Sequence, residues 1–207
     1  DDTVLGAIGM LGGAVEASGA ANFMMDNPIL VGELSGADST RVADIVRALK
    51  NAKLTAAASN TILTEEWTKF VGWLGLSGLA VLTRQESWKF MTDKDGARIV
   101  ARIMQDTAQL PQHLGIPLKT GPMFTFEAIS SGDEDAVVAF LRRRGEAQST
   151  TAPNFRQSML QDVDKGKQFE VEETFGYTVR KAKEFGLSVP TVETCYRILS
   201  GLNRMLQ

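Results

Sequence analysis

The chain has 207 residues and 43% of them are hydrophobic, which is enough to bury the core of one large domain, or of one domain with part of another. A formal net charge of −3 and a pI near 5.3 argue against a nucleic acid as the main partner. The single cysteine excludes an internal disulfide, and the single histidine leaves little for a histidine-based catalytic triad. No group of Cys, His and carboxylate residues has metal-ligand spacing. No apolar run reaches the length that spans a membrane.

Residues 1–36 are rich in glycine, and short apolar runs lie between the glycines and an Asn-Pro pair. This pattern is typical of strands and turns. Strands this short and this few do not make a stable sheet alone. We therefore predict that residues 1–36 are the terminal strands of an incomplete domain. The glycines of this segment are Gly6, Gly9, Gly12, Gly13, Gly19, Gly32 and Gly36.

From Ser39 onward the apolar residues recur with helical spacing, and residues 37–207 are predicted to form a domain of about seven helices. Thr64 is predicted as the N-cap of a central helix that is apolar on all sides beyond Lys69. Ser131 and Glu134 match a capping box for a later helix. The last helix carries an apolar stripe made of Cys195, Ile198, Leu199, Leu202, Met205 and Leu206. The fold class is therefore mainly α, with a few preceding β-strands.

Lys69 is unusual because it is the only charged residue between Trp67 and Leu82. One interpretation is that its stem lies along the core while its ammonium group reaches water. The other is that Lys69 points into a cleft, where partial burial lowers its pKa and lets it donate a proton near neutral pH.

Glu170 is the second charged residue in an unexpected place. On a helix it would lie at the border of an apolar face rather than among the exposed charges. It could simply complement a helix dipole, or it could face an active-site cleft. The predicted apolar face consists of Val171, Phe175, Thr178, Ala182 and Phe185.

Three segments resemble the ketopantoate reductase (2-dehydropantoate 2-reductase) family. "W-T-K" at Trp67–Lys69, before an apolar helix, resembles the helix that carries the family's catalytic lysine. "SMLQDVDKGKQFEVEETFG", from Ser158 to Gly176, resembles the family's "SSM-x-QD … G-R-x-T-E-I-x-x-x-N-G", and Gly186 to Pro190 continues the spacing. "ILVGELSG" at residues 29–36 resembles the end of the family's nucleotide-binding domain.

The resemblance implies an NADPH-dependent oxidoreductase that reduces a 2-keto acid to a 2-hydroxy acid, as in pantothenate biosynthesis. It implies that Lys69 and Glu170 are catalytic and that Ser158 binds substrate. It also implies a cytoplasmic protein, with a homodimer as an open alternative. The family's G-x-G-x-x-G motif is absent here, so cofactor-binding residues are not assigned and this chain alone is expected to be inactive.

The chain departs from the family pattern at three positions. The family's asparagines four and eight residues after the lysine are replaced by Trp73 and Ser77, and the asparagine of "N-G" is replaced by Phe175. Ser77 is retained as a predicted substrate-binding residue. Less polar recognition indicates that the substrate differs from ketopantoate.

Two alternatives remain open from the sequence. The chain could be a non-catalytic helical module for dimerisation or partner binding that kept the family fold. It could also belong to a related β-hydroxyacid-type dehydrogenase, whose lysine lies on a central helix too, but the segment from Ser158 to Glu170 would then be unexplained.

Overall fold

The computed structural model describes residues 3–9, 11–15, 18–120 and 125–206. The chain divides into two compact units, Asp1–Trp67 and Thr68–Gln207, each of which is described by itself. The predicted boundary between residues 36 and 37 separates domains, whereas the compact units are defined by contacts within the chain. The domain boundary therefore stays a prediction.

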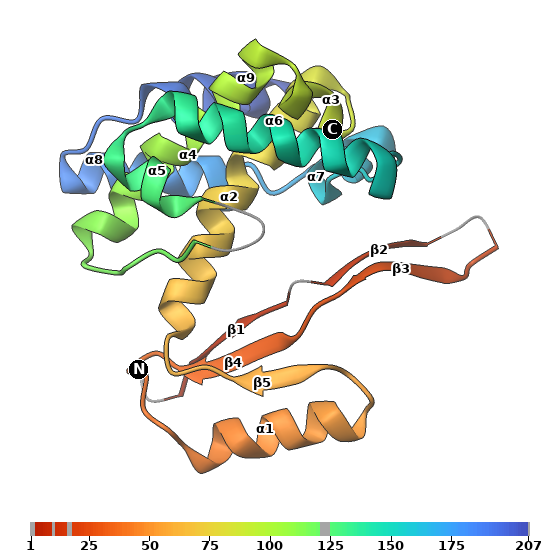
Figure 1. The fold of residues 1–207 in the computed structure, drawn as a ribbon, viewed down its shortest axis with the longest axis vertical. Helices are drawn as coiled ribbons and strands as arrows, with labels where there is room; N and C mark the ends of the chain where they lie inside the picture. Colours follow the sequence, from red (N-terminus) through yellow and green to blue (C-terminus); the bar gives the residue numbers. More distant parts are fainter. Residues whose placement is uncertain (1–2, 10, 16–17, 121–124, 207) are drawn as a thin grey trace. The chain divides into compact units, whose positions relative to one another are not determined.

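The first unit is a small sheet with one helix packed on it (Figure 1). Strand β1 (Leu5–Ile8) pairs antiparallel with β4 (Ile29–Glu33), and β4 pairs parallel with β5 (Ala56–Ala58). Helix α1 (Thr40–Asn51) covers β4 and β5. The core between helix and sheet is made of Val31, Val42, Val46 and Ala56, with Leu5, Ile29 and Leu49 packed against it.

A two-stranded antiparallel hairpin, β2 (Leu11–Val15) and β3 (Ala21–Asp26), completes the strands of this unit. The glycines Gly6, Gly12 and Gly13 therefore lie within paired strands. They do not form a loop between a strand and a helix N-terminus, which is the arrangement that binds a dinucleotide pyrophosphate.

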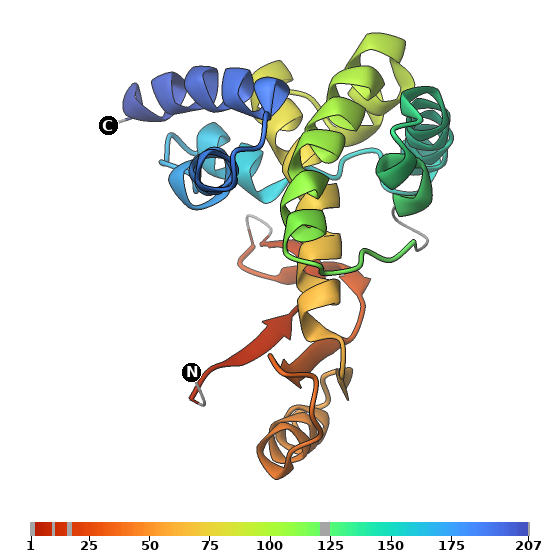
Figure 2. The same cartoon turned by 90° about the vertical axis from the view of Figure 1, so that its left-hand side faces the viewer.

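Helix α2 (Ile62–Thr83) begins in the first unit and continues into the second, which is helical (Figure 2). Figures 1 and 2 show α4 beside α2, and Gly75 allows this approach because a Cβ there would lie 3.1 Å from the Val100 carbonyl oxygen. The other helices are α3 (Ser87–Thr92), α4 (Lys94–His113), α5 (Phe126–Ser131), α6 (Glu134–Thr151), α7 (Ser158–Asp164), the π-helical turn η1 (Glu172–Gly176), α8 (Tyr177–Phe185) and α9 (Pro190–Arg204).

The predicted fold class, mainly α after a few strands, is confirmed. The sequence patterns predict neither α3 nor α5, which are only six residues long each. Within the described ranges, every helix is too short or too polar to cross a bilayer.

Three details of the predicted helices are wrong. Helix α2 begins two residues before Thr64, which is buried within the first turn. Asp133, not Ser131, caps α6, and its carboxylate accepts a 3.0 Å hydrogen bond from the Ala136 amide. On α9 the predicted stripe is only partly buried, because Ile198 and Met205 are 55% and 82% exposed.

Candidate functional site

Lys69 lies in the second turn of α2 and is partly buried. Burial lowers the pKa of its ammonium group below the ordinary value, because the charged form loses water. The two flanking residues are held from outside the helix: the Thr68 hydroxyl accepts a 3.1 Å hydrogen bond from the Lys119 amide, and the Phe70 ring meets the Tyr177 ring edge-on at 6.3 Å. The backbone at Lys69 is therefore fixed on both sides, and the predicted role of Lys69 as a proton donor stays a prediction.

Ser77 lies eight residues beyond Lys69 on α2 and is completely buried. Its hydroxyl has no hydrogen-bond partner among the described residues. Leaving such a group unpaired costs about 1–3 kcal/mol, so an unpaired buried hydroxyl requires an explanation. Binding of substrate by Ser77 stays a prediction.

The next residue, Gly78, is in close contact with Phe175. A Cβ at Gly78 would lie 2.9 Å from Cε2 of Phe175 and closer still to Cζ. Phe175 is completely buried, so its ring fills the space against this turn of α2. The absence of a side chain at Gly78 is what lets η1 approach the helix.

Glu170 lies in a bend just before η1, and it is exposed. The Thr174 hydroxyl donates a hydrogen bond to the Glu170 carbonyl, and the Gly176 amide donates to the Val171 carbonyl at 2.9 Å. The second bond spans five residues, which makes this turn π-helical; such turns are frequent at functional sites. Glu170 thus precedes the helix instead of lying on it. The prediction that it lies at the border of a helix's apolar face is therefore wrong.

Ser158 is the first residue of α7, and its side chain is exposed. The preceding residue, Gln157, is 7% exposed, and its side-chain amide donates a 3.0 Å hydrogen bond to the Ser87 hydroxyl. Ser158 itself makes no side-chain hydrogen bond within the described part of the chain, so its hydroxyl is available to a ligand.

Three contacts show that the segment from 156 to 177 runs back along α2. Arg156 pairs with Glu86 just beyond the C-terminus of α2, Phe175 contacts Gly78, and Tyr177 meets Phe70. Ser158 therefore lies toward the C-terminal end of α2 and Tyr177 toward Lys69. At 1.5 Å per residue, Lys69 and Ser77 are about 12 Å apart along the helix. The convergence of Lys69, Ser158 and Glu170 on one cleft stays a prediction.

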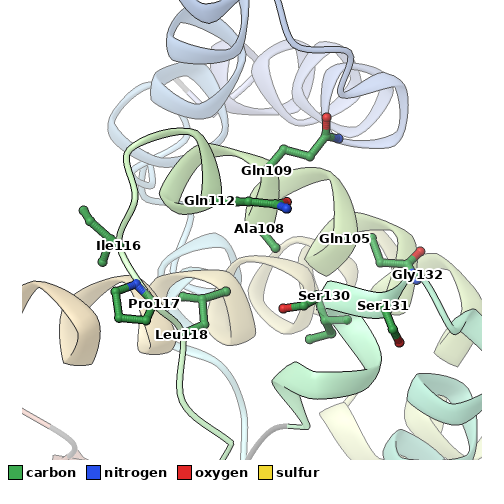
Figure 3. Close-up of a pocket in the computed structure, with 11 residues that line it drawn as sticks. Gln105, Ala108, Gln109, Gln112, Ile116, Pro117, Leu118, Ser130, Ser131 and Gly132 are labelled. Carbon is green, nitrogen blue, oxygen red and sulfur yellow. The ribbon is translucent and has the colours of Figure 1, made fainter.

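A cavity of about 460 Å³ lies in the second unit between α4, α5 and the loop at residues 116–118 (Figure 3). Figure 3 shows the Gln105 and Gln112 side chains on one side and Ser130 on the other. None of the four predicted site residues lines this cavity. The loop that lines the cavity leads directly to the predicted site, since Leu118 precedes Lys119, whose amide donates to Thr68.

Cys195 and His113 pack against other parts of the domain. Cys195 is buried, and burial, with a smaller contribution from Asp106, raises its thiol pKa to about 11, which keeps the thiol protonated and unreactive. The His113 ring stacks on the Phe185 ring at 4.4 Å. The burial of Cys195 agrees with its predicted place on the apolar stripe of the last helix.

Sequence reasoning missed the groups that support this site. The pairing of Arg156 with Glu86 and of Gln157 with Ser87 joins residues 70 positions apart, which no local pattern reveals. The close contact of Gly78 with Phe175 is long-range as well. A glycine in the middle of an apolar helix was the available signal, since such a glycine often has a packing reason.

More than half of the chain, residues 61–203, matches the family model described as ketopantoate reductase PanE/ApbA C terminal. A curated relative from Archaeoglobus fulgidus, named 2-dehydropantoate 2-reductase, is 25% identical over 199 residues, which is 96% of this chain and 60% of the relative. The chain thus spans about 60% of that relative's length.

Two solved structures share the fold. The dimeric ketopantoate reductase from Staphylococcus aureus superposes with a TM-score of 0.75 at 16% identity, covering 98% of this chain and 63% of the other. A D-mandelate dehydrogenase in complex with NADH superposes with a TM-score of 0.75 at 17% identity, covering 96% of this chain and 61% of the other.

Proposed function

Because the chain belongs to the ketopantoate reductase family, whose C-terminal domain it carries, we propose that the intact protein reduces a small 2-keto acid with NADPH. The observation that carries the proposal is Lys69, a half-buried lysine with a lowered pKa on the central helix of that domain. Reduction of a keto group needs a proton at the oxygen, and a desolvated lysine is suited to give one.

In this mechanism NADPH, when bound, supplies the hydride to the 2-keto carbon. The described strands of this chain do not form a phosphate-binding glycine loop, so we assign cofactor binding to a nucleotide-binding domain of the intact protein. The residues of this chain bind the substrate and move the proton.

Lys69 is proposed as the general acid that protonates the alkoxide oxygen formed at C2. Its lowered pKa brings proton donation closer to neutral pH than an exposed lysine allows. Glu170 is proposed to accept a hydrogen bond from the hydroxyl that forms or from a neighbouring one. Ser77 and Ser158 are proposed to donate hydrogen bonds to the carboxylate of the substrate.

The substrate is proposed to be a 2-keto acid with a more apolar side chain than ketopantoate. This is supported by Phe175, whose buried ring stands where the family has an amide, and by Trp73, which replaces a second amide. One protein of the same fold is named a D-mandelate dehydrogenase, and mandelate carries an apolar ring.

The non-catalytic alternative is not favoured, because the curated relatives are named as reductases or as an oxidoreductase. The alternative of a related β-hydroxyacid-type dehydrogenase is not favoured either, since the family match covers residues 61–203. The dimeric S. aureus relative supports a homodimer as a further proposal. A cytoplasmic location stays a prediction.

The test is steady-state NADPH oxidation by the intact protein with a panel of 2-keto acids. The panel includes ketopantoate, pyruvate and branched or aromatic 2-keto acids. We expect turnover, with the highest kcat/KM for an apolar side chain. A protein that reduces none of them would refute the function, and a clear preference for ketopantoate would refute only the substrate proposal.

A further inference from the structure

The connection from α6 to α7, residues 152–157, is attached to the start of α3 by side chains of consecutive residues. Arg156 donates from Nη1 to Oε1 of Glu86 at 2.8 Å, and Gln157 donates from Nε2 to Oγ of Ser87 at 3.0 Å. Two adjacent residues of one segment are therefore bonded to two adjacent residues of the other. Such a double attachment fixes both the position and the direction of the backbone that leads into α7.

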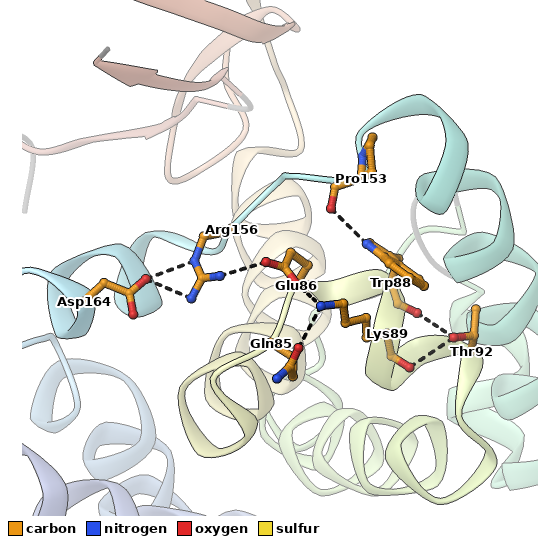
Figure 4. Close-up of polar contacts among 8 residues, drawn as sticks. All are labelled: Gln85, Glu86, Trp88, Lys89, Thr92, Pro153, Arg156 and Asp164. Atoms are coloured by element: carbon orange, nitrogen blue, oxygen red, sulfur yellow. Dashed lines mark hydrogen bonds and ion pairs between the residues drawn. The ribbon is translucent and has the colours of Figure 1, made fainter. Parts of the chain in front are cut away.

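Arg156 also holds the far end of α7. Its Nε and Nη2 atoms both lie 2.9 Å from Oδ2 of Asp164, the last residue of the helix (Figure 4). All three guanidinium nitrogens are thus engaged, and Figure 4 shows the Arg156 side chain between the two carboxylates. A planar guanidinium suits such a role because its donors have a fixed geometry.

The α3 side of the contact is itself ordered. Lys89 lies 2.8 Å from the second carboxylate oxygen of Glu86 and donates a 2.9 Å hydrogen bond to Gln85. Trp88 donates from its ring nitrogen to the Pro153 carbonyl at 2.9 Å. The Glu86 side chain is only 17% exposed, so its ion pairs are less screened than those of a surface carboxylate.

The residue that follows this anchored pair is Ser158. Its backbone is the first turn of α7, its side chain is exposed, and its hydroxyl makes no hydrogen bond within the described ranges. A fixed backbone that presents an unengaged hydroxyl is the arrangement expected of a pre-organised ligand contact. The contacts of Arg156 and Gln157 thus hold the residue directly before Ser158 as well as the end of α7.

We propose that Arg156 and Gln157 are positioning residues of the active site: by bonding Glu86 and Ser87 they hold the Ser158 hydroxyl where it meets the carboxylate of the 2-keto acid substrate. This inference rests on the proposed function. Because Glu86 follows the C-terminus of α2, the anchor also ties the Ser158 segment to the helix that carries Lys69.

The test is a double-mutant cycle in the intact protein with its best 2-keto acid. Ser158→Ala and Arg156→Ala should each raise KM for the keto acid about 10- to 100-fold, the range for a lost hydrogen bond to a charged group, with a smaller change in kcat. The double variant should be no worse than Ser158→Ala, because Arg156 acts through Ser158. Gln157→Ala should raise the same KM, and KM for NADPH should stay unchanged.

Arg98→Ala is the matched control. Arg98 has a side chain 31% exposed, against 32% for Arg156, and also pairs with two carboxylates, Glu134 at 2.8 Å and Asp135 at 3.0 Å. It should leave KM for the keto acid unchanged. If Arg156→Ala does not fold, Arg156→Lys and Gln157→Ala carry the same test.

The positioning role alone would be overturned if the KM increases of the two single variants combined fully in the double variant. A folded Arg156 variant with the wild-type KM would overturn it as well. An intact wild-type protein that reduces no 2-keto acid would overturn the proposed function and this inference with it. The two failures are therefore distinguished by the wild-type rate.

Discussion

At the scale of single residues, Lys69 and Ser77 share a feature: each is a polar group that α2 withdraws from water. For Lys69 the consequence is a lowered pKa, and for Ser77 it is an unpaired hydroxyl. A chain that only needed a stable core would be expected to carry apolar side chains at both positions. Both groups are explained together if they face a substrate with a keto oxygen and a carboxylate.

The lowered pKa of Lys69 predicts the alkaline limb of the pH profile. A general acid must hold its proton, so kcat should fall as pH rises through the Lys69 pKa, at a lower pH than for an exposed lysine. Lys69→Arg keeps its proton throughout this range and should have a low kcat without that limb. The measurement is kcat of the intact protein at neutral and alkaline pH, and a wild-type profile that is flat would contradict the acid role.

For Ser77 the expected outcome combines two readouts. Ser77→Ala removes an unpaired buried hydroxyl, so the free energy of unfolding of this chain should rise by up to about 1–3 kcal/mol. In the intact protein the same variant should raise KM for the keto acid, because the substrate loses a donor. Urea unfolding and steady-state kinetics check the two parts. An unchanged KM would show that Ser77 is only a core residue.

At the scale of elements, the contact of α2 with η1 decides how the segment from Ser158 to Gly176 lies on the central helix. Gly78 and Phe175 are complementary in size, since the ring occupies the volume that a side chain at 78 would need. The π-helical turn places the ring there by adding one residue between Val171 and Gly176.

Gly78→Ala should therefore destabilise this chain. The added methyl group would lie 2.9 Å or less from Phe175 ring atoms, and overpacking of this kind costs about 1–3 kcal/mol. Gly201→Ala on α9 is the control, because the nearest atom to a Cβ at this position is 3.9 Å away. The higher helix propensity of alanine should stabilise the chain there. The measurement is the urea midpoint, and Phe175→Leu should partly rescue Gly78→Ala. Equal midpoints for Gly78→Ala and wild type would show that the contact is loose.

The element scale also shows what the sequence could predict. The buried face of Val171, Phe175, Thr178 and Ala182 follows from helical periodicity, which survives a single π-helical turn. The caps at Thr64 and Ser131 were predicted wrongly, because a Ser or Thr at the right spacing competes with other cap residues and the pattern does not rank them. Asp133 is the N-cap of α6, and its carboxylate also complements the helix dipole.

At the scale of the whole molecule, the order of elements and the family followed from motifs, but the support of the site did not. Lys69 and Ser158 were identified as candidates because their local sequences resemble motifs of the family. Arg156 and Gln157 were not, because their partners are 70 residues away and come from a helix that no pattern predicted. Long-range pairing depends on the packing of α3 against its neighbours, which the chain acquires only on folding.

The family match places this chain in the C-terminal part of the ketopantoate reductase family. The sheet of the first unit contains no strand-to-helix glycine loop among its described residues, and the curated relatives are longer. We therefore propose that the hydride comes from a cofactor bound by the intact protein, and that the proton comes from this chain.

The most direct measurement is NADPH-dependent reduction of the best 2-keto acid by the intact protein and its Lys69→Ala variant. We predict that kcat falls by about 10²- to 10⁴-fold, as for lost acid catalysis, while the affinity for NADPH changes little. Glu170→Gln should lose less activity, since an amide still offers a hydrogen bond. Lys50→Ala, which removes an exposed lysine of α1, should leave kcat at the wild-type value. A Lys69→Ala variant that reduces its best substrate at near wild-type rate would contradict the account.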